Sequence, residues 1–494
     1  MKTVRILLLV TILLAGMVVG VSASSPYYSY TYSYQSDGTI TDIAAPLPYL
    51  PEAVYGTTDL QVPLQAPEDL VIDAAQEHFY IVDSTANAVY CFDRDFKLVK
   101  TIDSYVENGE TKTFASPTGI FLDAVDTLYV ADTNNERVVV LDAEGNFLRA
   151  ITRPESVLLP ENFAFMPLKV VADEAGRVFV LCKNVYEGLM QFSAEGAFVG
   201  FIGSNRVVFK LSELIWKTIM TDKQAEGMTS FVPVEYTNIS LDDDGFIYAV
   251  TSVKNVEAPI RRLNSSGDDI LIRNPLNGSE EVVGDVLYQE WSANSGDIVG
   301  PSAFVDITQD ANGNYYALDG KRGRIFAYDE EGNMLFVFGG IHTGQVGTFS
   351  SPSAVVYVEE KLYVLDKNRC NVTAFEPTVY TTTIHDAIDA YLQKDYEESI
   401  RLWEDVLKMN SNFDLAYMKA GYAYYRMNRY EEAMKYFKIA NARAEYSKAY
   451  IQYKKQQLNE HFGTIVLVAI AVLAAGVGAW IGIRRWRRRR RNRE

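Results

Sequence analysis

The chain contains little cysteine and little histidine. Its 494 residues include three cysteines and four histidines, and no pair of either type has the spacing of a metal site. An odd, sparse set of cysteines does not build a disulfide framework. Cys91 and Cys182 lie within apolar runs, so we expect them to be buried core residues. The sequence therefore predicts no metal, no cofactor and no disulfide scaffold.

Acidic residues outnumber basic residues between the two ends of the chain. The formal net charge is −18, with 46 Lys and Arg against 64 Asp and Glu. Because both ends are basic, the segment between them is more acidic than the chain as a whole. A surface of this charge argues against binding nucleic acid or other anionic polymers.

The N-terminal segment has the features of a secretory signal. Lys2 and Arg5 precede an apolar run from Ile6 to Val21, and Val21-Ser22-Ala23 offers small residues for cleavage. We expect residues 1–23 to be a signal peptide. An uncleaved N-terminal anchor is the alternative.

A second apolar run lies close to the C-terminus. Gly463 to Ile483 is 21 residues without a charge, which is long enough to cross a bilayer as a helix. The tail 484–494 follows and is rich in arginine, which favours a cytoplasmic position beside the membrane. The residues predicted to anchor at the membrane surface are Arg484, Arg485, Trp486 and Arg487. These features predict a single-pass membrane protein whose N-terminal bulk is extracytoplasmic.

One short strand phrase recurs six times between these ends. The phrases begin at Phe79, Leu128, Val178, Ile247, Tyr315 and Leu362, with spacings of 49, 50, 69, 68 and 47 residues. Each is preceded by a proline that can open a strand: Pro67, Pro117, Pro167, Pro233, Pro301 and Pro352. A period of about 40–50 residues with several short strands per unit is typical of a β-propeller. We therefore predict a mainly β fold with a six-bladed β-propeller over residues 66–381.

Four of the phrases end in aspartate. These are Asp83, Asp132, Asp319 and Asp366. A carboxylate at a strand end commonly accepts hydrogen bonds from its own turn, and we favour this structural role over a catalytic one. By the same reasoning, Arg137 and Arg324 are expected to tie blades together. No catalytic residue is predicted.

The units over about residues 66–381 resemble NHL repeats, most clearly in blades one, two, five and six. In blades three and four Cys182 and Thr251 replace the aspartate of the turn. The residues that carry the resemblance include Asp132-Thr133-Asn134-Asn135-Glu136-Arg137-Val138, with Pro117-Thr118-Gly119-Ile120 before it, and Asp319-Gly320-Lys321-Arg322-Gly323-Arg324-Ile325. The resemblance implies an interaction module. Related six-bladed propellers include lactonases and a peptide-processing lyase, which hold a divalent metal in the channel through carboxylate, Asn or His ligands. Only His78 and His342 lie in the propeller, and no such ligand set is evident. A metal-dependent lactonase-like or lyase-like enzyme remains the alternative.

The two long spacings indicate insertions around blades three and four. The excess falls in Ser204–Phe231, Val253–Pro259 and Asn274–Gly300. Links between blades and the middle turn of a blade project on one face, and loops on a rigid scaffold often bind ligands. The candidate binding residues are Leu211, Trp216, Lys217, Lys223 and Trp291. The ligand class stays open between a protein, a small molecule and a carbohydrate, and the insertions could also be merely tolerated.

The segment 24–65 is rich in Tyr, Ser and Pro. Tyr30, Tyr32 and Tyr34 alternate with polar residues as a strand would. This strand could join the last blade and close the ring. The alternative is that residues 353–384 supply that blade with enough strands of their own.

Residues 382–460 have a helical composition and a different period. Asp395-Tyr396-Glu397-Glu398-Ser399-Ile400 matches Arg429-Tyr430-Glu431-Glu432-Ala433-Met434 at an offset of 34. This resembles a pair of tetratricopeptide repeats. Trp403 falls on Phe437, so both are expected to pack between helices. Tyr391, Tyr417 and Tyr424 are predicted to form an exposed aromatic groove for a partner, with a spacer role as the alternative.

These patterns together predict an exported, membrane-anchored binding or scaffold protein of the cell envelope. The propeller would capture a ligand or a protein, and the helical repeats would mediate assembly near the membrane.

Overall fold

The computed structural model describes residues 27–35, 39–160, 162–204, 235–252, 258–273, 283–289, 292, 298–342 and 344–491. The predicted signal peptide lies outside these residues. The chain divides into two compact units. The first holds the residues up to Ser33 and Ile40–Thr382, and the second holds Tyr34–Thr39 and the chain from Thr383 onward.

The first unit is a six-bladed β-propeller, as predicted from the six phrases. Blade one is β4 (Pro67–Ile72), β5 (Phe79–Asp83), β6 (Ala88–Phe92) and β7 (Leu98–Ile102). Blade two is β10 (Pro117–Leu122), β11 (Leu128–Asp132), β12 (Arg137–Leu141) and β13 (Phe147–Thr152). Blade three is β14 (Pro167–Ala172), β15 (Val178–Cys182), β16 (Leu189–Phe192) and β17 (Phe198–Ile202).

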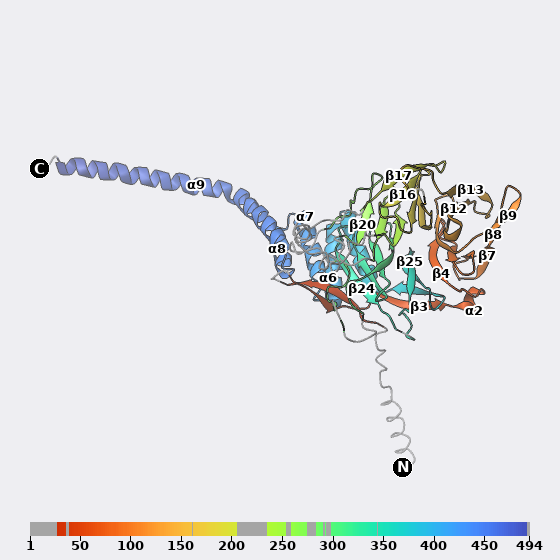
Figure 1. Ribbon diagram of the computed structural model, residues 1–494. Helices are drawn as coiled ribbons and strands as arrows, with labels where there is room; N and C mark the ends of the chain where they lie inside the picture. The colour runs from red at the N-terminus through yellow and green to blue at the C-terminus, as the bar shows by residue number, and fades with distance from the viewer. Residues whose placement is uncertain are drawn as a thin grey trace, which may run out of the picture. The chain divides into compact units, whose positions relative to one another are not determined.

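The other three blades depart from this four-stranded plan. Blade four is β18 (Asn238–Leu241), β19 (Ile247–Val250) and β20 (Ile260–Leu263). Blade five is β21 (Phe304–Gln309), β22 (Tyr315–Asp319), β23 (Arg324–Tyr328) and β24 (Met334–Gly339), extended by β1 (Tyr30–Tyr34) and β2 (Ile40–Ala44). Blade six is β25 (Pro352–Val358), β26 (Lys361–Asp366), β27 (Asn371–Pro377) and β3 (Tyr49–Tyr55). In Figure 1 the blades follow one another from orange at β4 to cyan at β25.

The six first strands form a closed ring. Each of β4, β10, β14, β18, β21 and β25 contacts the first strand of the next blade, and β25 contacts β4. The hydrophobic core lies between successive blades: Val82 of blade one, for example, packs in one cluster with Ile120 and Val139 of blade two. Because every blade is covered on both faces, its middle strands are almost wholly apolar. The second strand β5 is buried along its whole length.

The N-terminal segment adds strands to two blades. Strand β3 pairs with β27, so blade six takes its fourth strand from far upstream. The prediction that residues 353–384 supply enough strands is wrong, because β27 ends at Pro377 and a helix begins at Val379. The alternating tyrosines do form a strand, but β1 pairs with β24 of blade five, with Tyr30 opposite Val337.

Short elements connect blades, or strands within a blade. Helix α2 (Thr57–Leu60) follows β3, and the 3₁₀ helix η1 (Thr133–Asn135) forms the turn after β11. A separate hairpin of β8 (Ser104–Glu107) and β9 (Glu110–Thr113) links blades one and two.

The second unit is helical. It contains α5 (Val379–Leu392), α6 (Tyr396–Met409), α7 (Asp414–Arg426), α8 (Tyr430–Ile439) and α9 (Arg443–Arg491), although α5 begins within the first unit. Helices α6 to α9 pack one against the next in chain order. Trp403 and Phe437 are each 1% exposed, as expected for the matched positions of two repeats. Gly421 makes room for Phe437, because a Cβ at position 421 would lie 2.8 Å from the Phe437 ring.

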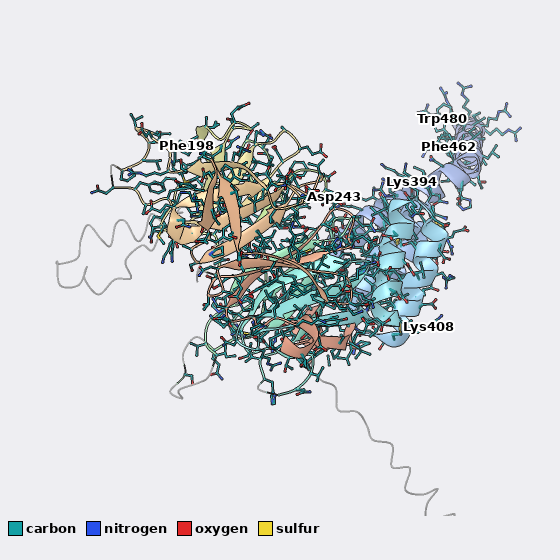
Figure 2. All side chains as sticks on the ribbon, turned by 90° about the vertical axis from the view of Figure 1, so that its right-hand side faces the viewer. Phe198, Asp243, Lys394, Lys408, Phe462 and Trp480 are labelled. Carbon is teal, nitrogen blue, oxygen red and sulfur yellow. The ribbon has the colours of Figure 1, made fainter. Side chains whose placement is uncertain are left out.

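Helix α9 is long and apolar enough to cross a membrane. It spans 49 residues, and its most apolar window has a mean hydropathy of 2.5. Phe462 and Trp480, which lie along this helix in Figure 2, are 61% and 59% exposed. Apolar side chains exposed along a whole helix are stable in lipid rather than in water.

Candidate functional site

One position recurs in the first strand of every blade. In each blade, this residue pairs with the fourth residue of the phrase that forms the second strand of the same blade. Asp69 pairs with Val82 in this way, and Lys169 pairs with Leu181. In five blades it follows an irregularity in the strand register, which turns the local backbone. Its six occupants are Asp69, Gly119, Lys169, Asn238, Asp306 and Ala354. Because the first strands form a ring, we call these six residues the inner ring.

The two acidic members of the inner ring each tie their own blade to the next one. Asp306 accepts hydrogen bonds from its own neighbour Ile307 (N–Oδ1, 2.8 Å) and from Val355 of blade six (N–Oδ2, 2.6 Å). Asp69 does the same with Leu70 (N–Oδ1, 3.2 Å) and with Ile120 of blade two (N–Oδ2, 3.0 Å). Each carboxylate therefore satisfies two backbone N–H groups in adjacent blades.

The amide of Asn238 extends the same scheme from blade four to blade five. Its Oδ1 accepts from the N–H of Ile239 at 2.7 Å, and its Nδ2 donates to Oδ1 of Asp306 at 2.6 Å. Blades four, five and six are thus joined by one continuous chain of hydrogen bonds.

A buried ion pair connects two blades that are not neighbours. Lys169 Nζ of blade three lies 2.7 Å from Asp69 Oδ1 of blade one, and the two side chains are 13% and 7% exposed. Gly119 of blade two stands between them in the ring. A Cβ at position 119 would lie 2.3 Å from the carbonyl oxygen of Leu168 and 2.9 Å from Cα of Lys169. The absence of a side chain at Gly119 therefore allows the strand that carries Lys169 to approach.

The second carboxylate of the ring is held in an unusual electrostatic state. Burial raises the pKa of Asp306 to about 7, and the nearby charge of Asp69 acts in the same direction. The Lys169 ammonium and the N–H groups of Val355 and Ile307 oppose this shift. Desolvation is the largest cause, as expected for a carboxylate with little access to water.

The inner ring lies close to one face of the propeller. The first strands begin where the second strands end, as shown by the pairing of Pro67 with Asp83 and of Pro167 with Cys182. The third strand begins and the fourth strand ends at this same side, because Leu189 pairs with Ile202. We call this side the proline face. In the four-stranded blades that the structure describes, the links to the next blade and the middle turns therefore leave from the proline face.

The predicted insertions join strand ends at the proline face, and most of their length lies outside the described residues. Leu211, Trp216, Lys217, Lys223 and Trp291 all lie outside the described residues. Their assignment as binding residues stays a prediction. The described flanks agree with the topology, because Ser204 follows β17 and Glu235 precedes β18.

The aspartates at the ends of the phrases are engaged with backbone. Asp83 Oδ1 accepts from Thr85 and Ala86 in the following turn, and Oδ2 accepts from Gln65 before the first strand (2.6 Å). Asp366 likewise accepts from the N–H groups of Ser350 and Arg369. These contacts fix two turns against each other, which is the structural role expected from the sequence.

Arg137 and Arg324 both contact segments outside their own blade sheets. Arg137 Nε donates to Asp132 at 2.9 Å within its own blade, and its Nη2 donates to the carbonyl of Thr113 at 3.3 Å in the hairpin that links blades one and two. Arg324 pairs with Asp285, which also accepts from the hydroxyl of Tyr30 at 2.5 Å. Arg324 therefore helps hold β1 on blade five, which sequence reasoning did not anticipate.

The aromatic groove predicted on the helical unit is wrong for Tyr424. This side chain is 8% exposed, and its hydroxyl donates to Glu404 at 3.3 Å. Tyr436 donates to the same carboxylate at 2.6 Å. The Tyr436 ring, with its centroid 5.1 Å away, and the Arg429 guanidinium, 4.7 Å from the ring centroid, cover Tyr424. Glu404, which sequence reasoning missed, is therefore the polar centre of this packing.

Tyr391 and Tyr417 are half-buried. Tyr391 accepts a hydrogen bond from Arg426 Nε at 3.2 Å, and Tyr417 donates to the carbonyl of Ser411 at 3.2 Å. Both rings keep some accessible surface, so a role in partner binding stays a prediction for these two residues.

The C-terminal part of α9 contains two tryptophans and a run of arginines. Arg484 stacks over Trp480 with 5.0 Å between guanidinium and ring, and Arg490 stacks over Trp486 at 5.3 Å. Both residue types suit the boundary between lipid and water.

Comparison with known proteins finds similar solved structures but no family. No protein-family model matches the chain, and no curated protein matches it. Among solved structures, virginiamycin B lyase from Staphylococcus aureus is similar at 11% identity, with 66% of this chain and 99% of that chain covered and a TM-score of 0.39. A protein of unknown function from Bacteroides thetaiotaomicron is similar at 13% identity, with 71% and 76% covered and a TM-score of 0.41. A proposed gluconolactonase is similar at 13% identity, with 71% and 98% covered and a TM-score of 0.39.

The residues of the inner ring do not fit the channel metal that the resemblance to lactonases and lyases implies. The ammonium group of Lys169 lies 2.7 Å from the carboxylate of Asp69. This positive charge would repel a metal ion bound to the same carboxylate. In the part of the chain that the structure describes, no group of three or more His, Cys, Asp or Glu is placed to hold a metal ion.

Proposed function

We propose that this chain is a membrane-anchored binding or scaffold protein whose propeller captures a ligand or protein partner at the proline face. One observation carries the proposal. The polar side chains of the inner ring are engaged with one another and with backbone, as in the pair Lys169–Asp69 and the contact of Asn238 with Asp306. Side chains engaged in this way hold blades together. The long insertions on the proline face are then the surface that can bind a ligand or a protein partner.

The anchoring part of the proposal rests on α9. Its apolar stretch is followed by arginines, and the arginine–tryptophan stacks lie at the end of that stretch. The apolar N-terminus and the arginine tail support export of the propeller with the tail in the cytoplasm. In this arrangement the helical unit, which resembles tetratricopeptide repeats, mediates assembly near the membrane.

A metal-dependent lactonase-like or lyase-like enzyme is the alternative function. The observation in its favour is Asp306, whose pKa of about 7 would suit proton transfer. However, both of its carboxylate oxygens already accept hydrogen bonds, from Ile307, Val355 and Asn238. Proton transfer to a substrate would require this inter-blade chain to open.

Deletion of the largest insertion tests the proposal. The full-length chain and a variant lacking residues 205–231 are expressed in cells, cross-linked with formaldehyde and purified, and their cross-linked partners are compared. We expect the variant to show the same thermal transition for the propeller, because the ring strands lie outside the deletion, and to lose the cross-linked species. A folded variant that keeps every cross-linked species would contradict binding through this insertion.

A further inference from the structure

The inner ring contains the oxygen donors of a cation site, but the chain itself supplies a positive charge there. Asp69, Asn238 and Asp306 occupy equivalent positions in blades one, four and five. Carboxylate and amide oxygens are the ligands preferred by hard divalent cations such as Ca²⁺. The remaining polar member of the ring is Lys169, and its ammonium lies 2.7 Å from Asp69.

The charge of Lys169 acts on both carboxylates. It pairs directly with Asp69, and it is the largest influence that opposes the raised pKa of Asp306. Two buried carboxylates without this ammonium would repel each other, and a buried charge that loses its partner is strongly destabilising. The stability of the inner ring therefore depends on one positive charge beside Asp69 and Asp306.

The backbone around Lys169 is built to deliver the ammonium. The close approach at Gly119 sets the path of residues 168 and 169, because the carbonyl of Leu168 and Cα of Lys169 occupy the space of a side chain at position 119. Thr118 strengthens this approach by donating from Oγ1 to the carbonyl of Leu168 at 3.0 Å. Blades two and three are thus locked in the position that brings Lys169 to Asp69.

We propose that Lys169 is a built-in cation that takes the place of a bound metal ion in the propeller channel. The inference does not depend on the binding function proposed above. It implies that the native propeller needs no divalent cation for stability. It also implies that removal of the ammonium turns the oxygens of Asp69 and Asp306 into a site for Ca²⁺.

Three full-length proteins purified in detergent test this inference: the wild type, Lys169→Met, and the double variant Asp69→Asn with Lys169→Met. The double variant is the matched control, because it removes one negative and one positive charge together. Thermal unfolding of the propeller is followed in EDTA and in millimolar CaCl₂, and bound Ca²⁺ is measured by equilibrium dialysis.

The wild type is expected to unfold at the same temperature in EDTA and in CaCl₂ and to retain no stoichiometric Ca²⁺. Lys169→Met should unfold at least about 3 °C lower in EDTA, recover in CaCl₂ and bind one Ca²⁺ per chain. The double variant should be insensitive to Ca²⁺. One Ca²⁺ per chain in the wild type that is lost in the double variant would overturn the inference. A Lys169→Met protein that folds but neither binds Ca²⁺ nor recovers in it would also overturn it. If Lys169→Met does not fold in EDTA, its expression and folding in CaCl₂ give the same answer.

Discussion

Lys169 Nζ lies 2.7 Å from Asp69 Oδ1, although the two residues belong to the third and the first blade of the propeller. A contact between neighbouring blades would follow from any closed ring of sheets. A contact that spans the intervening blade requires that blade to carry a residue without a side chain, and Gly119 meets this requirement. The arrangement explains why the inner ring is polar in a molecule whose blades are otherwise separated by apolar layers.

The raised pKa of Asp306 predicts a pH dependence of stability. An aspartate titrates near 3.9 in an unfolded chain, and here at about 7 in the folded chain. The folded state therefore binds the extra proton, and its contribution to stability is complete below about pH 4 and is lost as the pH rises through about 7. We expect the melting temperature of the propeller to fall between pH 5 and pH 8.

The matched variant for this prediction is Asp306→Asn. Its amide nitrogen cannot accept from the N–H of Val355, so the variant should be less stable overall. The fall in melting temperature between pH 5 and pH 8 should nevertheless be smaller than in the wild type. Equal slopes for the two proteins would mean that Asp306 does not titrate in this range.

Gly119→Ala should destabilise the propeller through backbone crowding. The new Cβ would lie 2.3 Å from the carbonyl oxygen of Leu168, and neither strand can move without disturbing the ring. We expect a loss of about 3 kcal/mol or more in the free energy of unfolding. Gly340→Ala is the control, because nothing lies within 4 Å of a Cβ at that position. Chemical denaturation of both variants checks the prediction, and equal stabilities would argue against close packing at Gly119.

Trp403→Ala should unfold the helical unit and spare the propeller. Trp403 is 1% exposed, and its truncation should cost about 3–5 kcal/mol. The chain forms two compact units, so calorimetry of the wild type should show two transitions, and only the transition of the helical unit should shift. Lys408→Ala is the control, because the Lys408 side chain is 75% exposed and lies on the same helix α6 (Figure 2). If Trp403→Ala also lowers the propeller transition, the two units unfold together.

The topology prediction concerns the two ends of α9. A protease added to intact protoplasts should degrade the propeller and leave a C-terminal epitope tag beyond the arginine tail intact. Detergent should make the tag accessible, which serves as the control. Cleavage of the tag without detergent would reverse the proposed orientation.

The repeating strands could be predicted from the sequence because their signal is local. Each phrase is a short apolar run that ends in a turn residue, and the six phrases became the second strands of six blades, as with Phe79–Asp83 in β5. The burial of Trp403 could also be predicted, because its match with Phe437 is a local pattern in the sequence.

The pairings that depend on distant segments could not be predicted. Strand β1 joins blade five because Tyr30 reaches Asp285, and nothing near Tyr30 in the sequence indicates that partner. The exposure predicted for Tyr424 was wrong because its cover comes from other helices, through Glu404 and Tyr436. The contact between Lys169 and Asp69 was also missed. In the sequence, this contact is indicated by a polar residue at the same position of several first strands. The pattern becomes visible when the first strands are aligned by their pairing with the six phrases.

Site-specific photo-cross-linking tests the central claim most directly. A photoreactive amino acid is placed at Trp216, within the largest insertion of the proline face, or at Val125, in the turn between β10 and β11 on the opposite face, where the side chain is 78% exposed. The account predicts that illumination of cells gives a defined covalent adduct from position 216 and none from position 125. An adduct from position 125 with none from position 216 would contradict binding at the proline face.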